Sequence, residues 1–175
     1  SVFDECHFAI DDVKIAKLLD GFHASWYMTS VSAECGTDRL VELMERKLVS
    51  ADVWVNWQGD EPFINTKMIA TLLQSIHSTT EECWTLKKRI DNPAQINAKN
   101  IAKVVSDTTG NAIYFSRSPI PCYRDNDGTP QEYYKHVGLY AFADSVIPKI
   151  AALDPGRLEN AEKLEQLRFL ENGIT

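Results

Sequence analysis

A nearly continuous apolar run, Val53 to Trp57, stops abruptly at the polar turn Gln58-Gly59-Asp60-Glu61-Pro62. Runs of this length that are rich in β-branched and aromatic residues are typical of a strand buried on both faces of a parallel sheet. Ligands of such sheets bind beyond the carboxyl ends of the strands, where a carboxylate can hold Mg²⁺ together with substrate phosphates. The turn is also ordinary loop chemistry, in which Pro62 ends the strand and the acids are solvated, and from these residues alone that interpretation is the stronger one.

Length and composition favour a single globular domain, residues 1–175. Of the 175 residues, 44% are hydrophobic and 25% are charged, and no apolar stretch is long enough to span a membrane. The formal net charge of −7 argues against a general nucleic-acid binder, which would carry a basic stripe. The four cysteines lie far apart without a CxxC pair, which argues against a zinc site and indicates a reducing cytoplasm.

Hydrophobic periodicity predicts alternating strands and helices. Strands are expected at 8–10, 53–57, 83–86, 101–105, 112–115 and 137–142. Helices are expected at 13–20, from 37 or 38 to 48, at 68–76 and at 159–172. The alternation predicts an α/β fold with a mostly parallel sheet, helices on both faces and an antiparallel excursion around the turn at 107–111. We expect a mobile loop from Tyr123 to Gln131, which is polar and contains glycine.

Five short segments carry a family resemblance when they are taken together and in order. They are Gly36–Arg39, Asn56–Pro62, Tyr114–Pro121, Tyr134–Ala141 and Glu162–Glu171. Each is weak alone, but the ordered set covers almost the whole chain and resembles the 3-deoxy-manno-octulosonate cytidylyltransferases, also called CMP-Kdo synthetases. The resemblance implies a Rossmann-like fold of the nucleotide-diphospho-sugar transferase type.

The same resemblance implies an enzyme that transfers CMP from CTP to the acidic sugar 3-deoxy-D-manno-octulosonate (Kdo). Pyrophosphate is released, and CMP-Kdo feeds lipopolysaccharide synthesis. The two catalytic candidates are Asp60, which would hold Mg²⁺ against the CTP phosphates, and Arg117, whose guanidinium matches the sugar carboxylate. The loop at Gly36 and Thr37 would meet the cytosine ring. The sugar would contact the remaining candidates, Gln58, His136, Tyr140, Glu165 and Gln166.

Without the resemblance, several of these residues have plainer interpretations. Arg117 would be a surface charge that closes a hairpin, and His136 would be a structural histidine at the start of a strand. Glu165 and Gln166 would be solvated positions at the edge of a helix's apolar face. The family pattern reverses these preferences.

Three departures from the family pattern stand out. Cys35 replaces the usual serine, which weakens one polar contact near the base, and Trp57 replaces an aliphatic residue, which demands extra room behind its strand. The chain shows neither the family's first strand and triphosphate loop nor its later segment with a second metal-binding aspartate. We therefore expect a domain that is incomplete at both ends.

The implied partners are CTP and Kdo, with Mg²⁺ as cofactor, a homodimer by resemblance, and no membrane or nucleic acid. Two alternatives stay open. One is the same chemistry on a related acidic sugar such as an amino-substituted Kdo, because one substituent changes pocket affinity by only a few kcal/mol. The other is a catalytically inactive fragment that binds the sugar through Arg117, His136 and Glu165.

Overall fold

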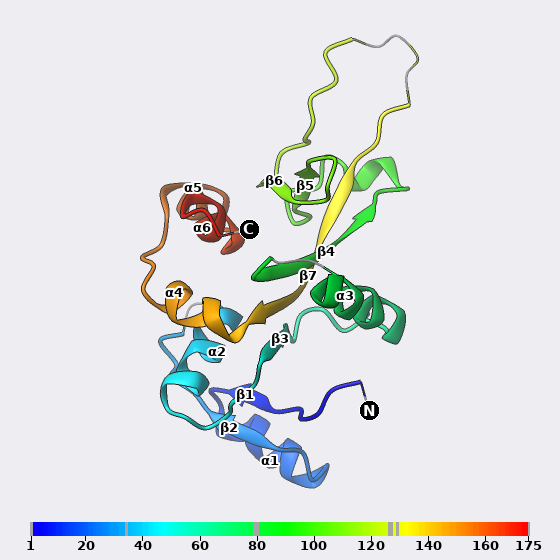
Figure 1. Cartoon of the computed structure of the whole chain (residues 1–175). Coiled ribbons are helices and arrows are strands. Elements are labelled where there is room, and N and C mark those ends of the chain that lie inside the picture. Colours follow the sequence, from blue (N-terminus) through cyan, green and yellow to red (C-terminus); the bar gives the residue numbers. More distant parts are fainter. Residues whose placement is uncertain (1, 34, 79–80, 126–127, 129, 175) are drawn as a thin grey trace.

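The computed structural model describes every residue except 1, 34, 79–80, 126–127, 129 and 175. Its strands are β1 (Phe8–Ile10), β2 (Trp26–Met28), β3 (Val53–Trp57), β4 (Cys83–Arg89), β5 (Lys103–Ser106), β6 (Ala112–Ser116) and β7 (Tyr134–Ala143). Its α-helices are α1 (Val13–Gly21), α2 (Gly36–Glu45), α3 (Thr66–Ser78), α4 (Ile147–Ala151), α5 (Arg157–Glu162) and α6 (Gln166–Glu171). Two 3₁₀ turns, η1 (Pro93–Gln95) and η2 (Asp144–Val146), complete the order shown in Figure 1. None of the described helices is both long and apolar enough to cross a bilayer.

Local sequence signals set several element boundaries. Asp12 caps α1 by accepting a hydrogen bond from Lys14 N at 2.7 Å. Asp107 closes the β5–β6 hairpin by accepting from the backbone N–H groups of Thr109 and Asn111, each at 2.9 Å. The mobile loop expected at 123–131 includes residues 126, 127 and 129, which lie outside the described part of the chain.

The strand pairings correct the expectation of a mostly parallel sheet. Among the described residues, only β1 and β2 pair in parallel, as a separate two-stranded sheet. The larger sheet runs β3-β7-β5-β6 with β4 on the other side of β7, and all of its pairings are antiparallel. β3 and β4, which are joined through α3, run in the same direction, as expected for a helical crossover. However, β7 lies between them and is antiparallel to both.

β7 is the strand that is buried on both faces. Leu139, Ala141 and Phe142 have no exposed surface, whereas β3 has a single buried position, Trp54, which is still 6% exposed. The prediction of a doubly buried strand at 53–57 is therefore wrong. β3 lies at the end of the strand order, so its side chains are covered less completely than those of the central β7.

Helices cover both faces of the larger sheet, as predicted for an α/β fold. On one face, α3 packs Ile69 and Leu72 against Val137, Leu139 and Ala141 of β7. On the other face, α2, α4 and α6 enclose Tyr140 and Phe142. Figure 1 shows β7 passing through the middle of the molecule between these layers. The alternation of side chains along β7 thus supplies both halves of the core.

The helix predicted at 159–172 is broken in two. α5 ends after Glu162, Lys163 adopts a left-handed conformation with φ 54°, and α6 begins at Gln166. Leu164 and Leu167 are buried, whereas Ala161 is exposed. The break turns the carbonyls of Glu162 and Lys163 away from helical partners and toward the side chain of Arg117.

Candidate active site

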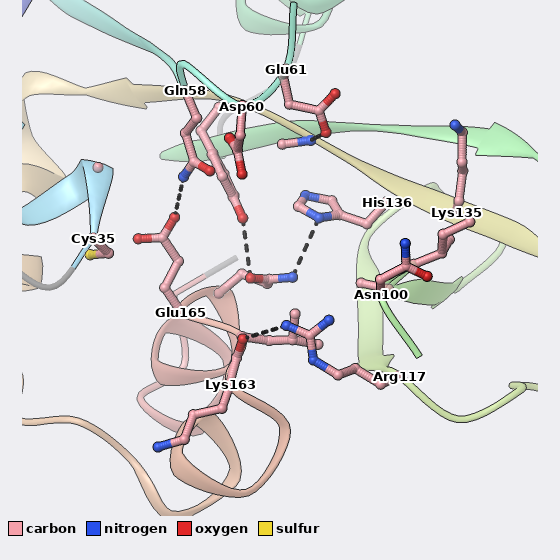
Figure 2. Close-up of a pocket in the computed structure, with 17 residues that line it drawn as sticks. Cys35, Gln58, Asp60, Glu61, Asn100, Arg117, Lys135, His136, Lys163 and Glu165 are labelled. Atoms are coloured by element: carbon pink, nitrogen blue, oxygen red, sulfur yellow. Dashed lines mark hydrogen bonds between the residues drawn. The ribbon is translucent and has the colours of Figure 1, made fainter. Parts of the chain in front are cut away.

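A cavity of about 430 Å³ opens beyond the carboxyl end of β3 (Figure 2), a volume in the usual range for small-molecule sites. Six parts of the chain supply its walls: the start of α2, the turn after β3, the loop before β5, the residue that follows β6, strand β7 and the α5–α6 junction. The lining residues are Cys35, Gly36, Gln58, Asp60, Glu61, Asn100, Ile101, Ala102, Arg117, Lys135, His136, Gly138, Tyr140, Lys163, Leu164, Glu165 and Gln166.

The structure brings together every candidate residue from the sequence except one. Thr37 does not line the cavity: it is 2% exposed, and its hydroxyl accepts a hydrogen bond from Asn56 Nδ2 at 3.4 Å. Gly36 does line it and packs closely, because a Cβ there would lie 3.2 Å from the Asn56 amide and 3.3 Å from Gln58 Cγ. The contact of both residues with cytosine stays a prediction.

The turn after β3 is held by its own hydrogen bonds and by β7. Glu61 N donates to Gln58 O at 3.1 Å, and Trp57 Nε1 donates to Glu61 O at 2.9 Å. Gly138 N of β7 donates to Glu61 Oε1 at 3.2 Å. Trp57 is 47% exposed, so the room behind the strand that its size suggested is not needed. These contacts leave Asp60 exposed at the cavity wall, with its carboxylate directed inward in Figure 2.

Arg117 is held by backbone carbonyls from two directions. Its Nε donates to Glu162 O at 2.6 Å and its Nη2 donates to Lys163 O at 2.9 Å, both at the end of α5. Its Nη1 donates to Lys99 O at 2.9 Å. Three of the five guanidinium N–H groups are thus used for positioning, and one on each terminal nitrogen is left for a ligand.

Glu162 fixes the main chain at Arg117. Its carboxylate accepts from Arg117 N at 2.9 Å and from the Ser116 hydroxyl at 2.7 Å. Burial acts to raise the pKa of Glu162, but these hydrogen bonds outweigh it and the net shift is downward. The carboxylate therefore stays ionised and holds the end of β6 against the end of α5.

Lys103 is a fully buried lysine behind the same wall. It is 0% exposed, and its ammonium donates to the carbonyls of Ala98, Ile101 and Arg117. Burial, followed by the nearby charge of Arg117, lowers the pKa of Lys103. All three ammonium donors are satisfied, so Lys103 ties the loop before β5 to the segment that carries Arg117.

We expect Lys103→Met to lower the free energy of unfolding by about 3 kcal/mol, because three buried carbonyls lose a charged donor. Urea denaturation measures the change. Lys88→Met makes the same substitution at an exposed position of β4 and should shift the free energy by less than about 0.5 kcal/mol. Equal effects of the two substitutions would contradict the role given to Lys103.

Glu165 carries the least satisfied polar atom of the cavity. Its Oε1 accepts from Gln58 Nε2 at 2.7 Å, but its buried Oε2 has no hydrogen-bond partner among the described residues. Cys35 lies beside it, and burial, reinforced by Glu165, raises the pKa of the Cys35 thiol. A buried carboxylate oxygen without a donor is costly, so this position is suited to a ligand that brings a hydroxyl.

A buried chain of hydrogen bonds crosses the floor of the cavity. The Tyr140 hydroxyl donates to Gln166 Oε1 at 3.1 Å, and Gln166 Nε2 lies 3.4 Å from His136 Nδ1. Burial lowers the pKa of His136 to about 4, so the imidazole is neutral near pH 7. Burial, then the charge of Glu165, raises the pKa of Tyr140.

Desolvation of the partly buried His136 makes the free energy of unfolding depend on pH. Its pKa is about 4 in the folded state, whereas the ordinary pKa of a solvent-exposed histidine is 6.5, so the unfolded chain binds more protons between these values. Stability is therefore fully present above pH 6.5 and falls as the pH drops, by about 3 kcal/mol at pH 4. Urea unfolding from pH 4.5 to 7 should show this slope in the wild type and a flatter one in His136→Gln; identical slopes would contradict it.

Sequence reasoning missed several residues of the site. Glu61, Asn100, Lys135 and Lys163 line the cavity, and Lys103 supports it from behind. Lys103 left a readable signal, since a lysine inside the apolar run of β5 must either be exposed or satisfy its charge internally. Asn100 and Lys163 left none, because their position depends on loops that fold onto distant strands.

Comparison with known proteins identifies the family. A family model described as cytidylyltransferase matches residues 1–175. The 3-deoxy-manno-octulosonate cytidylyltransferase of Chlorobium limicola is 43% identical over 170 residues, which cover 95% of this chain and 68% of the relative. The protein of the same name from Geobacter metallireducens is 42% identical over 176 residues, with the same coverage of 95% and 68%.

A solved structure agrees with these relatives. The structure of CMP:2-keto-3-deoxy-manno-octonic acid synthetase complexed with CTP has a TM-score of 0.88 to this chain, at 39% identity, over 97% of this chain and 69% of that one. The α/β fold is therefore that of a cytidylyltransferase. The chain belongs to the 3-deoxy-manno-octulosonate cytidylyltransferase family. This confirms the resemblance based on the five segments.

Proposed function

We propose that this cytidylyltransferase uses the cavity beyond β3 to transfer CMP from CTP to Kdo, with release of pyrophosphate. The observation that carries the proposal is the convergence of Asp60, Arg117, His136 and Glu165 on one cavity, although they come from four separate segments. The overall likeness to a CTP-complexed synthetase supports a fold of the Rossmann-like, nucleotide-diphospho-sugar transferase type.

The polar groups of the cavity suit an acidic sugar. The two unused terminal N–H groups of Arg117 can grip a carboxylate as a fork. On the facing wall, the unpaired Glu165 Oε2 can accept from a sugar hydroxyl, and Gln58 already orients that carboxylate. An anionic group at Arg117 and a hydroxyl at Glu165 define the two ends of a polyhydroxy acid. Gln166, His136 and Tyr140 form the floor between them.

The residues present fit Mg²⁺ held mainly by substrate phosphates. The described residues contain no cluster of three or more His, Cys, Asp or Glu side chains that could hold a metal by themselves. Mg²⁺ commonly needs only one or two protein carboxylates, because phosphates and waters complete its octahedron. Asp60 supplies such a carboxylate at the cavity wall, whereas Glu61 is already engaged by Gly138. When bound, the ion would offset the negative charge that develops on the phosphate oxygens.

The protein's own contribution to the reaction is positioning. In-line attack by the anomeric hydroxyl on the α-phosphorus requires the sugar and the nucleotide to be held together in a fixed geometry. Arg117 and Glu165 would fix the sugar, Asp60 would face the phosphates, and the start of α2 at Gly36 would approach the base. We further propose that the enzyme works in the cytoplasm, where it meets both substrates, and that it works as a homodimer. Sedimentation of the purified protein tests the dimer.

The identity of the sugar is tested by competition. In a mixture of CTP, Mg²⁺, Kdo and an amino-substituted Kdo, mass spectrometry should detect CMP-Kdo as the main product. A predominance of the amino-sugar product would favour the related acidic sugar instead. Binding of Kdo without any product would favour a sugar-binding fragment.

A further inference from the structure

We propose that Thr85 is a positioning residue that fixes the tautomer and ring orientation of His136 at the cavity floor. Thr85 lies in β4 and does not line the cavity beyond β3. The inference about the His136 ring stands on the contacts of Thr85, whereas its consequence for Kdo binding rests on the proposed function.

The central strand β7 pairs irregularly with β4. β4 pairs with β7 through Thr85↔Tyr140 and then Leu86↔Val137, so Gly138 and Leu139 are two extra residues between consecutive positions of β4. Such bulges disrupt the ladder locally and are often found beside active sites. Here the Gly138 N–H turns to the carboxylate of Glu61, at 3.2 Å.

The hydroxyl of Thr85 replaces the ladder contacts at this bulge. Thr85 Oγ1 lies 3.2 Å from Val137 O and 3.0 Å from Leu139 O, and both carbonyls can only accept. The single hydroxyl proton must therefore point toward these carbonyls. The lone pairs of Oγ1 remain, and His136 Nε2 lies 2.9 Å away.

This arrangement selects one tautomer of the imidazole. Because Thr85 Oγ1 can only accept on this side, His136 Nε2 must carry the proton and donate it. On the other side of the ring, the hydroxyl of Tyr140 donates to Gln166 Oε1, which leaves Gln166 Nε2 facing His136 Nδ1 as a donor. The Gln166 side agrees with a protonated Nε2 and an unprotonated Nδ1, but it can reverse, because the amide can turn over and the Tyr140 hydroxyl can accept instead of donate. The fixed carbonyls beside Thr85 cannot reverse, so the tautomer of His136 is decided at Thr85.

Aromatic neighbours limit rotation of the same ring. Phe115 meets His136 edge-on, with centroids 5.1 Å apart and planes at 78°, and Tyr140 lies 5.3 Å away at 53°. Packing thus limits the ring plane, and Thr85 sets which nitrogen faces Gln166. Loss of the Thr85 hydroxyl should therefore allow the imidazole proton of His136 to move from Nε2 to Nδ1, while the ring stays packed between Phe115 and Tyr140.

Nitrogen NMR of the histidine-labelled protein tests the inference without any substrate. His136→Gln assigns the His136 signals, and the protonated and unprotonated ring nitrogens differ strongly in chemical shift. The wild type and Thr85→Ser should show protonated Nε2, while Thr85→Val should move the proton partly or wholly to Nδ1. Thr71→Val is the matched control, because the hydroxyl of Thr71 also donates to a backbone carbonyl, Lys67 O, on the exposed face of α3.

Kinetics supply the second readout. Thr85→Val should raise the KM for Kdo about tenfold and leave the KM for CTP unchanged, while Thr85→Ser should restore the wild-type value. A wild-type His136 that carries its proton on Nδ1 would overturn the inference, even if Thr85→Val fails to fold. A folded Thr85→Val with an unchanged tautomer would overturn it as well. Absence of turnover with Kdo in the wild type would instead count against the proposed function, and the NMR result would stand by itself.

Discussion

Asp60→Asn is expected to lower the rate of CMP transfer at saturating CTP, Kdo and Mg²⁺ by about a thousandfold, or about 4 kcal/mol of transition-state stabilisation. The substitution keeps the shape of the side chain but removes the charge at the cavity wall that faces the phosphates. Because Asp60 is exposed, the free energy of unfolding should change by no more than about 0.5 kcal/mol. Initial rates of pyrophosphate release measure the loss.

Asp52→Asn provides the matched control for Asp60. Asp52 is an exposed carboxylate just before β3, at the opposite end of the strand from the cavity. Asp52→Asn removes the same negative charge and should keep the wild-type rate of CMP transfer. A rate for Asp60→Asn within tenfold of the wild type would contradict the role of this carboxylate.

The second large effect is expected at Arg117. Arg117→Lys should raise the KM for Kdo at least about a hundredfold, because an ammonium cannot hold three carbonyls and a carboxylate in a planar arrangement. It should leave the KM for CTP within about threefold of the wild type. Stability should fall by about 2 to 3 kcal/mol, since the carbonyls of Lys99, Glu162 and Lys163 lose good donors.

Arg124→Lys is the matched control, because it shows what replacing an arginine by lysine does at a position outside the cavity. The side chain of Arg124 is 90% exposed and pairs with Asp125, so its conversion to lysine should change neither KM nor stability measurably. If folded Arg117→Lys bound Kdo as tightly as the wild type, the carboxylate of the substrate could not lie at this guanidinium.

Much of the fold was predictable because the local signals were strong. The Asp12 cap, the Asp107 hairpin and the covering of both sheet faces by helices all follow from patterns within a few residues. The direction and burial of strands were less accessible. The apolar run at 53–57 fits a central strand, but β7 takes that place. The pairing of strands whose residues are more than 80 positions apart leaves no local mark in the sequence.

The α5–α6 junction shows the same limit within the site. Periodicity is continuous from 159 to 172, yet the chain breaks at Lys163 because Arg117, 46 residues earlier, takes the carbonyls that the helix would have used. The residue types of the site were visible through the ordered motifs. The supporting contacts of Lys103 and Thr85 were not, because a buried lysine and a bulge are defined by three-dimensional partners.

The most direct test of the central claim is pyrophosphate release from CTP, measured with and without Kdo in the presence of Mg²⁺. The account predicts release that depends on Kdo, yields CMP-Kdo in equal amount and is nearly abolished in Asp60→Asn. Release that proceeds equally without Kdo, or no release from the folded wild-type protein, would contradict the assignment of this cavity as the site of CMP transfer.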